Sequence, residues 1–392
     1  MKEKTLKSKI LMLGTILICL TMLIFGITLT KQNNQTKEVF ADTYTDNSGN
    51  TWTYTLDGTD ATITGFSGTI TNGTVTIPAT LGDNNEYDVV GIIGKTDNSM
   101  RSILYDYRNE ITNIVIPNSE KFSSIGGYSF SQLSNLQTIN LTDNIRTIGT
   151  EAFNSCANMS GIFNLTNLES LGGGAFSGSA ITSISFGDNL ISNDMYTFSG
   201  CTQLNSVTFS NNFVDIADGT FYGCTSIVSL DLSNTKISEI KFSHSEGPTR
   251  LISDLGGMSN LTTLKLPSTL STVTNSCFVG NTSLQNVYIF ATTPPSVRTL
   301  ASYLSTYDTT IFDGCTSLSK IYVPAESVNA YKQADGWSEY EDLIEAYVPP
   351  TLPETGVSAN VIVPTITIVA VLILGVTGYI FSNNKKTKKI VK

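Results

Sequence analysis

The chain has 392 residues, of which 40% are hydrophobic and 14% are charged, so it can fold into one large domain or two ordinary ones and is not disordered in composition. Its formal net charge is −10, but both ends are basic, and the segment 42–355 holds 31 acidic and only 12 basic residues. A body this acidic excludes nucleic acid as the expected partner. We interpret the acidity as favouring solubility, with attraction of cations or basic partners as the alternative.

Residues 1–41 have the organisation of a secretory signal peptide. Lys2, Lys4, Lys7 and Lys9 precede an apolar run over 10–29. The small and apolar residues that end this segment predict cleavage between Ala41 and Asp42. An uncleaved membrane anchor is the alternative, because an apolar run of about 20 residues is long enough to cross a bilayer.

The next segment, 42–86, alternates polar and apolar residues and contains Gly and Asn-Gly turn signals. Its core is "NTWTYTLDGTDATITGFSGTITNGTVTIP". Trp52, Tyr54 and Leu56 are two residues apart, which places them on one face of a strand. The pattern predicts a β-rich cap in front of the rest of the body.

A repeat of the form x-F-x-G-C-T-x-L-x-x-I-x-L follows. Its phenylalanines are Phe130, Phe153, Phe176, Phe198, Phe221, Phe278 and Phe312. The first five are 22 or 23 residues apart, within the range of leucine-rich repeats. The two longer intervals predict insertions at "KFSHSEGPTRLISDLGG", together with a degenerate repeat, and at "ATTPPSVRTLASYLSTYD".

Each copy can supply one strand to a shared core. The last two apolar positions of L-x-x-I-x-L point to one face of a strand, as in Leu204, Val207 and Phe209. Further inward residues follow, such as Ile145 and Ile148. No single turn can bury its apolar residues alone, but turns stacked about 4.8 Å apart can. We therefore predict a leucine-rich repeat solenoid, with a strand and an irregular or short helical turn in each repeat.

These repeats resemble the BspA-like leucine-rich repeat family of bacterial surface proteins, over residues 87–346. The end of this region, from about 321, is similar to the family's C-terminal cap, in which Tyr331, Trp337 and Leu343 would close the core. The resemblance implies adhesion or protein–protein contact, with no cofactor and no enzymatic activity.

The chain ends in three parts that follow a short Pro-rich linker, 347–351. These are Leu352-Pro353-Glu354-Thr355-Gly356, an apolar span over 357–381 and a tail over 382–392 with five lysines. Together they resemble the cell-wall sorting signal (LPXTG) of Gram-positive surface proteins.

The resemblance implies that a sortase binds Leu352 and Pro353, breaks the bond between Thr355 and Gly356, and transfers Thr355 to an amine of peptidoglycan. Pro353 favours an extended Leu352, which suits a groove. The apolar span would cross the membrane only in the precursor, with the lysines in the cytoplasm. The mature protein would be secreted and covalently attached to the cell wall.

The sequence contains little that suggests catalysis. His244 is the only histidine, and no C-x-x-C pattern is present, so we expect no metal site. Adjacent repeats could form disulfides, such as Cys201 with Cys224. The odd number of cysteines in the mature chain and their spacing of one per repeat favour buried thiols instead. These cysteines are Cys156, Cys201, Cys224, Cys277 and Cys315.

The outward positions of the strands are the candidate ligand face. Most are Ser, Thr or Asn, and a smaller set could anchor a protein or glycan: Phe163, Asn286, Tyr288, Lys320 and Tyr322. The alternative is that Thr and Tyr are simply favoured in strands. An adhesin for host or neighbouring-cell ligands is the first hypothesis for function, and a wall-proximal structural or accessory protein is the second.

Overall fold

The structure is a computed structural model that describes residues 41–244, 251–298 and 310–349. The N-terminal cap begins with three antiparallel strands, β1 (Ala41–Thr45), β2 (Thr51–Asp57) and β3 (Asp60–Ser67). Strand β3 then pairs in parallel with β6 (Tyr87–Ile92), to which β5 (Thr80–Leu81) adds an antiparallel edge. The cap therefore shares one continuous sheet with the first repeats.

The expected inward face of the cap is buried. Trp52 and Tyr54 are 1% and 2% exposed, and Leu56 packs against the same core. The Asp46 carboxylate accepts hydrogen bonds from the backbone N–H groups of Ser48 and Asn50 and from Nε1 of Trp52. These bonds fix the turn between β1 and β2 and orient the indole toward the core.

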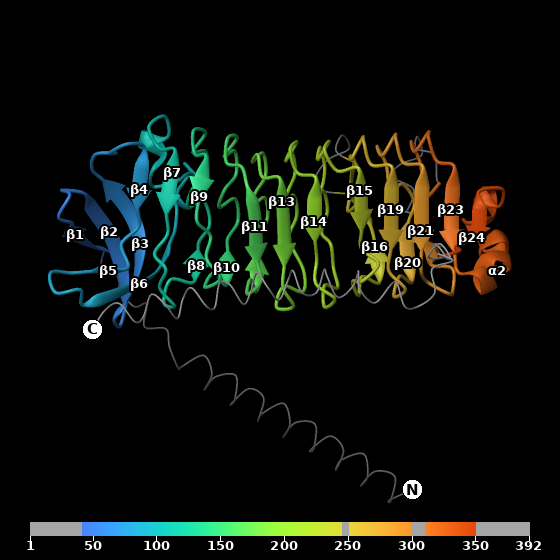
Figure 1. The fold of residues 1–392 in the computed structure, drawn as a ribbon, viewed down its shortest axis with the longest axis horizontal. Coiled ribbons are helices and arrows are strands. Elements are labelled where there is room, and N and C mark those ends of the chain that lie inside the picture. The colour runs from blue at the N-terminus through green and yellow to red at the C-terminus, as the bar shows by residue number, and fades with distance from the viewer. Residues whose placement is uncertain (1–40, 245–250, 299–309, 350–392) are drawn as a thin grey trace, which may run out of the picture. The chain divides into compact units, whose positions relative to one another are not determined.

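The L-x-x-I-x-L segments form most of a first row of short strands (Figure 1), and those that pair with a neighbouring repeat do so in parallel. The strands of this row are β4 (Thr74–Thr76), β7 (Asn113–Val115), β9 (Thr138–Ile139), β11 (Ile162–Leu165), β13 (Ser183–Phe186), β14 (Ser206–Thr208), β15 (Ser229–Asp231), β19 (Thr263–Leu266), β21 (Asn286–Ile289), β23 (Lys320–Val323) and β24 (Ile344–Ala346).

The rest of each repeat contributes to a second row, which the sequence did not predict as strands. It continues from β6 through β8 (Ser124–Ile125), β10 (Thr147–Ile148) and β12 (Ser170–Leu171), and it resumes in β16 (Glu239–Ile240), β20 (Thr272–Thr274) and β22 (Ser296–Arg298). Turns join the two rows. Helical segments among the described residues are η1 (Tyr105–Tyr107), η2 (Ala325–Ser327), α2 (Val328–Gln333) and η3 (Ser338–Tyr340). The predicted leucine-rich repeat solenoid is confirmed.

The repeated phenylalanines form a stacked column between the rows. Ring centroids from Phe130 through Phe221 are 5.2–5.9 Å apart along the column, with planes tilted by no more than 22°. Phe278 and Phe312 continue it at 5.1 Å. Each ring is at most 5% exposed. The column thus contributes both apolar burial and aromatic contact to the cohesion of neighbouring repeats.

The long interval between Phe221 and Phe278 contains a repeat with Leu255 in place of phenylalanine. Leu255 is fully buried, and Leu261, Leu264 and Leu266 form its buried strand positions. The additional residues form an antiparallel hairpin of β17 (Phe242–His244) and β18 (Leu251–Ser253). The predicted insertion and degenerate repeat are both present. Most of the second predicted insertion, 299–309, lies outside the described residues.

All five cysteines of the body are free and buried, as the buried-thiol interpretation expects. The thiols of Cys156, Cys201 and Cys224 donate to the carbonyl of the phenylalanine in the preceding repeat, at 3.0–3.1 Å. Burial raises the pKa of Cys156 to about 12 and that of Cys201 to about 11. These thiols therefore act as small apolar groups with one weak donor each.

The C-terminal cap closes the core as the sequence predicts. Tyr331 and Trp337 are fully buried, and Leu343 is partly buried and packs against the core. The Tyr331 hydroxyl donates to the carbonyl of Ala291 at 2.9 Å, and Trp337 Nε1 donates to the carbonyl of Pro295 at 2.8 Å. Both aromatic side chains therefore bury their surface without leaving a polar atom unpaired.

The prediction that Phe163 lies on the outward face is wrong. Phe163 is 7% exposed and pairs in register with the buried Ile184, whereas Ile162 beside it is 71% exposed. The cause is one additional residue before the strand, where Gly161 has a φ of +139°. A shift of one residue exchanges the two faces of a strand.

Several sequence predictions lie outside the described residues. They are the signal peptide up to residue 40, the motif Leu352–Gly356 with Thr355, the span 357–381 and the tail 382–392. Ala41 and Asp42 are the first residues of β1 and are exposed, and their processing stays a prediction. None of the helices in the described segments is long and apolar enough to span a membrane.

Candidate functional site

The outward side chains of β15, β19, β21 and β23 form a surface that we call the C-terminal face. The parallel register aligns them in two rows across the four strands. One row is Ser229, Thr263, Asn286 and Lys320, and the other is Asp231, Lys265, Tyr288 and Tyr322. The register thus gathers four of the five predicted face residues, Asn286, Tyr288, Lys320 and Tyr322, on two adjacent strands.

The two tyrosines are the aromatic centre of the C-terminal face. The Tyr288 and Tyr322 rings stack with centroids 4.6 Å apart and planes 19° apart, a distance set by the spacing of neighbouring strands. Both side chains are half-buried. A stacked pair loses little conformational freedom when a ligand binds, so it suits the role of an anchor.

Charged pairs lie on both sides of the tyrosines. Lys265 Nζ is 2.8 Å from Asp231 Oδ2, and Lys320 pairs with Glu345 of β24. Partial burial acts to raise the pKa of Asp231, but hydrogen bonds from Lys265 and Ser233 outweigh it, and the pKa lies below its ordinary value. The charges of the C-terminal face are therefore balanced within it, although the body as a whole is acidic.

Sequence reasoning missed Lys265 and Glu345. Lys265 belongs to the repeat that lacks a phenylalanine, so the aromatic template passed over it. The spacing of Leu261, Leu264 and Leu266 was the available signal, because it places Thr263 and Lys265 at outward positions. Glu345 follows the last repeat, and only the folding of the cap brings it to Lys320.

The outward side of the middle strands β11, β13 and β14 is different. It carries Asn164, Ser185 and Thr208, and Ser185 Oγ donates to Asn164 Oδ1 at 2.7 Å. The exposed apolar residue here is Ile162 rather than the predicted Phe163. Because this side has no aromatic pair and no charged pair among the described contacts, it is the weaker candidate for ligand binding.

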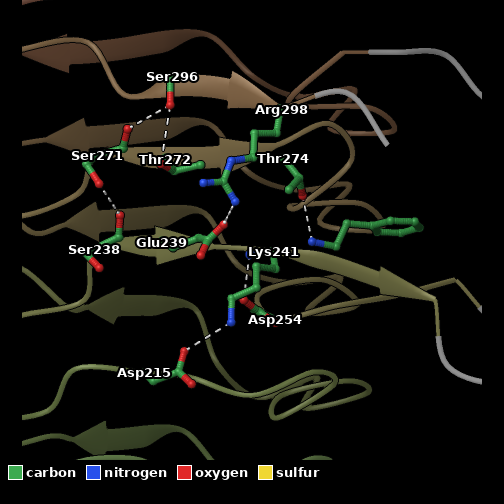
Figure 2. Close-up of polar contacts among 11 residues, drawn as sticks. Asp215, Ser238, Glu239, Lys241, Asp254, Ser271, Thr272, Thr274, Ser296 and Arg298 are labelled. Atoms are coloured by element: carbon green, nitrogen blue, oxygen red, sulfur yellow. Dashed lines mark hydrogen bonds and ion pairs between the residues drawn. The ribbon is translucent and has the colours of Figure 1, made fainter. Parts of the chain in front are cut away.

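The second row carries a separate polar network near the insertion (Figure 2). Lys241 Nζ is 3.6 Å from Asp215 Oδ1, and Arg298 donates to Glu239 Oε1 at 2.7 Å. The hydroxyls of Ser271 and Ser296 donate to carbonyls of the neighbouring repeats. Each of these contacts joins two adjacent or near-adjacent repeats, so we interpret the network as a structural clamp.

Asp254 is the buried member of this network. It is 1% exposed, and its Oδ2 accepts the backbone N–H of Lys241 at 2.6 Å, closing the base of the hairpin. No donor in the described structure reaches Oδ1. Burial and the neighbouring Asp218 carboxyl raise the pKa of Asp254 to about 9. Asp254 therefore carries a proton at neutral pH.

The described part of the chain contains no group of three His, Cys, Asp or Glu side chains that could hold a metal ion. The cysteine thiols are buried, and burial is the main cause that raises the pKa of each, which makes them poor nucleophiles.

Comparison with known proteins agrees with this class of fold. The model for the BspA type leucine rich repeat region matches residues 98–191, 123–249 and 257–386. These matches cover well over half of the chain, and the chain belongs to this family. None of the curated proteins compared with the chain is a significant match.

Solved structures similar to this chain are also leucine-rich repeat proteins. One from Bacteroides ovatus is 21% identical, covers 69% of each chain and has a TM-score of 0.47. A leucine rich cell surface protein from Faecalibacterium prausnitzii is 15% identical over 79% of this chain and 96% of its own, with a TM-score of 0.36. A leucine-rich repeat protein from T. pallidum is 21% identical over 59% and 87%, with a TM-score of 0.39.

Proposed function

We propose that this protein is a surface interaction protein that binds a protein or glycan through the C-terminal face. The observation that carries the proposal is the Tyr288–Tyr322 stack, which lies between two charged pairs on five neighbouring strands. Aromatic anchors surrounded by polar groups are typical of binding sites, in which a few side chains supply most of the affinity.

A binding screen with two matched variants tests this role. The complete chain is screened against host matrix proteins and purified wall glycans, and each ligand found is titrated. We expect the double substitution Tyr288→Ser with Tyr322→Ser to weaken binding about 30-fold or more, because truncating even one hot-spot side chain costs about 2 kcal/mol or more. Tyr222→Ser is the control, since Tyr222 is 54% exposed and outside the C-terminal face. Equal affinity of wild type and double variant would reject this face.

We further propose that the protein is secreted after cleavage between Ala41 and Asp42 and attached to peptidoglycan through Thr355. The support is the order of the motif Leu352–Gly356, the apolar span and the lysine tail, which is the order in a sorting signal. The sortase is a transient partner, and this chain is its substrate rather than an enzyme. The membrane would hold only the precursor.

Mass spectrometry of wall digests tests the attachment. We expect a C-terminal peptide that ends at Thr355 and carries a peptidoglycan fragment, and no peptide from 357–392. Thr355→Ala should leave the precursor in the membrane fraction, whereas Thr351→Ala, just before the motif, should be processed normally. Recovery of intact C-terminal peptides from wild-type wall material would contradict the attachment.

The second candidate role is that of a wall-proximal structural or accessory protein without a host ligand. It is favoured by the short linker, 347–351, between the body and the motif. In the screen described above, this role predicts binding to wall glycans alone, and the adhesin role predicts binding to a host matrix protein.

A further inference from the structure

A hollow of about 420 Å³ lies on the turns of three consecutive repeats, away from the C-terminal face. Its main lining residues are Glu151, Asn154, Gly174, Ser177, Asp194 and Tyr196. The volume is within the range of small-ligand sites. The proposed function does not use any of these residues.

The hollow exists because one position of the repeat carries a different side chain in each of the three repeats. The residue two before the buried phenylalanine has a left-handed backbone in each repeat, with φ of 52° at Glu151, 61° at Gly174 and 59° at Tyr196. Backbone hydrogen bonds of 2.8–2.9 Å link these positions to the following repeat. Gly174 has no side chain, and so a gap opens between Glu151 and Tyr196.

Two carboxylates lie along the glycine floor of this gap. A Cβ atom on Gly174 would lie 3.2 Å from Glu151 Cγ, and one on Gly173 would lie 3.4 Å from Asp194 Oδ2. Asp194 uses its other oxygen to accept the N–H of Met195 at 2.7 Å. None of the described residues that line the hollow is basic.

No described residue supplies a counter-charge to the Glu151 carboxyl. It is half-buried, burial raises its pKa, and no described residue donates a hydrogen bond to it or pairs with it. A partly desolvated carboxylate is stabilised by any donor cation that enters the gap. The described residues include no group of three His, Cys, Asp or Glu side chains that could hold a metal ion, so an organic cation suits the gap better than a metal ion.

We propose that this hollow binds an arginine side chain of a polypeptide partner. A guanidinium has five N–H donors in one plane, which suits the acceptors Glu151, Asp194 and Ser177. Its planar face and alkyl stem can pack against the Tyr196 ring. The net charge of −19 over 42–355 favours a basic partner as well. The site is independent of the C-terminal face, and either can fail without the other.

Saturation-transfer NMR on the complete chain tests the site with a blocked Gly-Arg-Gly peptide as probe. We expect saturation of the arginine side chain, a weaker signal from the lysine peptide, and none from the citrulline peptide, which has the same shape without the charge. Glu151→Gln should weaken binding about tenfold, the effect of one lost hydrogen bond to a charged group. Gly174→Asn, which keeps a residue that tolerates a left-handed backbone, should fill the gap and abolish binding.

Glu110→Gln is the matched control, because it removes the same charge from an exposed carboxylate outside the hollow. Circular dichroism checks that each variant is folded. If Gly174→Asn does not fold, the result for Glu151→Gln decides the test. The Tyr288→Ser/Tyr322→Ser variant should bind the arginine peptide like wild type. The proposal is overturned if Glu151→Gln binds like wild type, if Glu110→Gln loses as much affinity, or if the citrulline peptide binds equally well.

Discussion

At the scale of single residues, each buried position of the repeat accepts only those polar groups that find a hydrogen-bond partner there. The cysteine position can hold a thiol, because a weak donor reaches the carbonyl of the previous repeat. Asn281 fills the same position in another repeat and pairs its amide with Leu255 and Met258 instead. Asp254 is the exception, since it places an ionisable group where only one of its oxygens finds a donor.

The first prediction concerns Asp254. Its pKa is about 9 in the folded state against an ordinary value of 3.8, so the folded protein keeps a proton that the unfolded chain releases. This contribution to stability is complete below pH 3.8 and is lost as the pH rises toward 9, by at most ~1.4 kcal/mol per pH unit. Asp254→Asn resembles the protonated acid and cannot ionise, so it should be the more stable protein at pH 8 and equal near pH 4.

Urea unfolding of both proteins at several pH values between 4 and 9 measures this difference. Asp188→Asn serves as the control, because Asp188 is an exposed aspartate whose removal should leave the pH dependence unchanged. Parallel stability curves for wild type and Asp254→Asn would show that the buried carboxyl is already ionised at neutral pH.

At the scale of strands and turns, the periodic phenylalanines were enough to predict the stacked repeats and the inward strand positions. The closing role of Tyr331 and Trp337 came from the resemblance to the family's C-terminal cap. Departures from the period were not predictable in the same way. The additional residue at Gly161 changes which face of β11 is buried. Its effect depends on the position at which the backbone accommodates the additional residue. The Asp254–Asp218 contact depends on the path of an insertion, which no repeat template describes.

The second prediction tests the register of β11. Phe163→Ala should lower the free energy of unfolding by about 3–5 kcal/mol, because it opens a cavity in the core. Ile162→Ala should change it by no more than ~0.5 kcal/mol, because its side chain is 71% exposed. Denaturant unfolding compares the two. The reverse order of effects would place Phe163 outside, as its position in the sequence template suggests.

At the scale of the whole molecule, neighbouring repeats are joined by backbone ladders, the aromatic column and the clamp of the second row. In such arrays each unit is stabilised mainly by its neighbours, and the two ends need caps. Both caps are built around a buried tryptophan. The proposed attachment begins only a few residues after β24, and this determines how far the body can lie from the wall.

The third prediction follows from that distance. The linker 347–351 spans only about 15 Å even when fully extended as polyproline, so the body should lie close to its point of attachment. Antibodies against the body should label intact cells weakly and wall-thinned cells strongly. A variant with a long Ser/Thr/Pro segment inserted after Tyr347 is the control and should label strongly in both. Strong labelling of intact wild-type cells would contradict the proposed proximity.

The two tryptophans of the chain, Trp52 and Trp337, are buried in opposite caps. Each can therefore report by its fluorescence on one terminus of the array alone. Replacing one of them by phenylalanine leaves a protein with a single emitter in a known cap. Comparing the two single-emitter proteins during denaturation would show whether the array opens from the N-terminal cap, from the C-terminal cap, or from both at once.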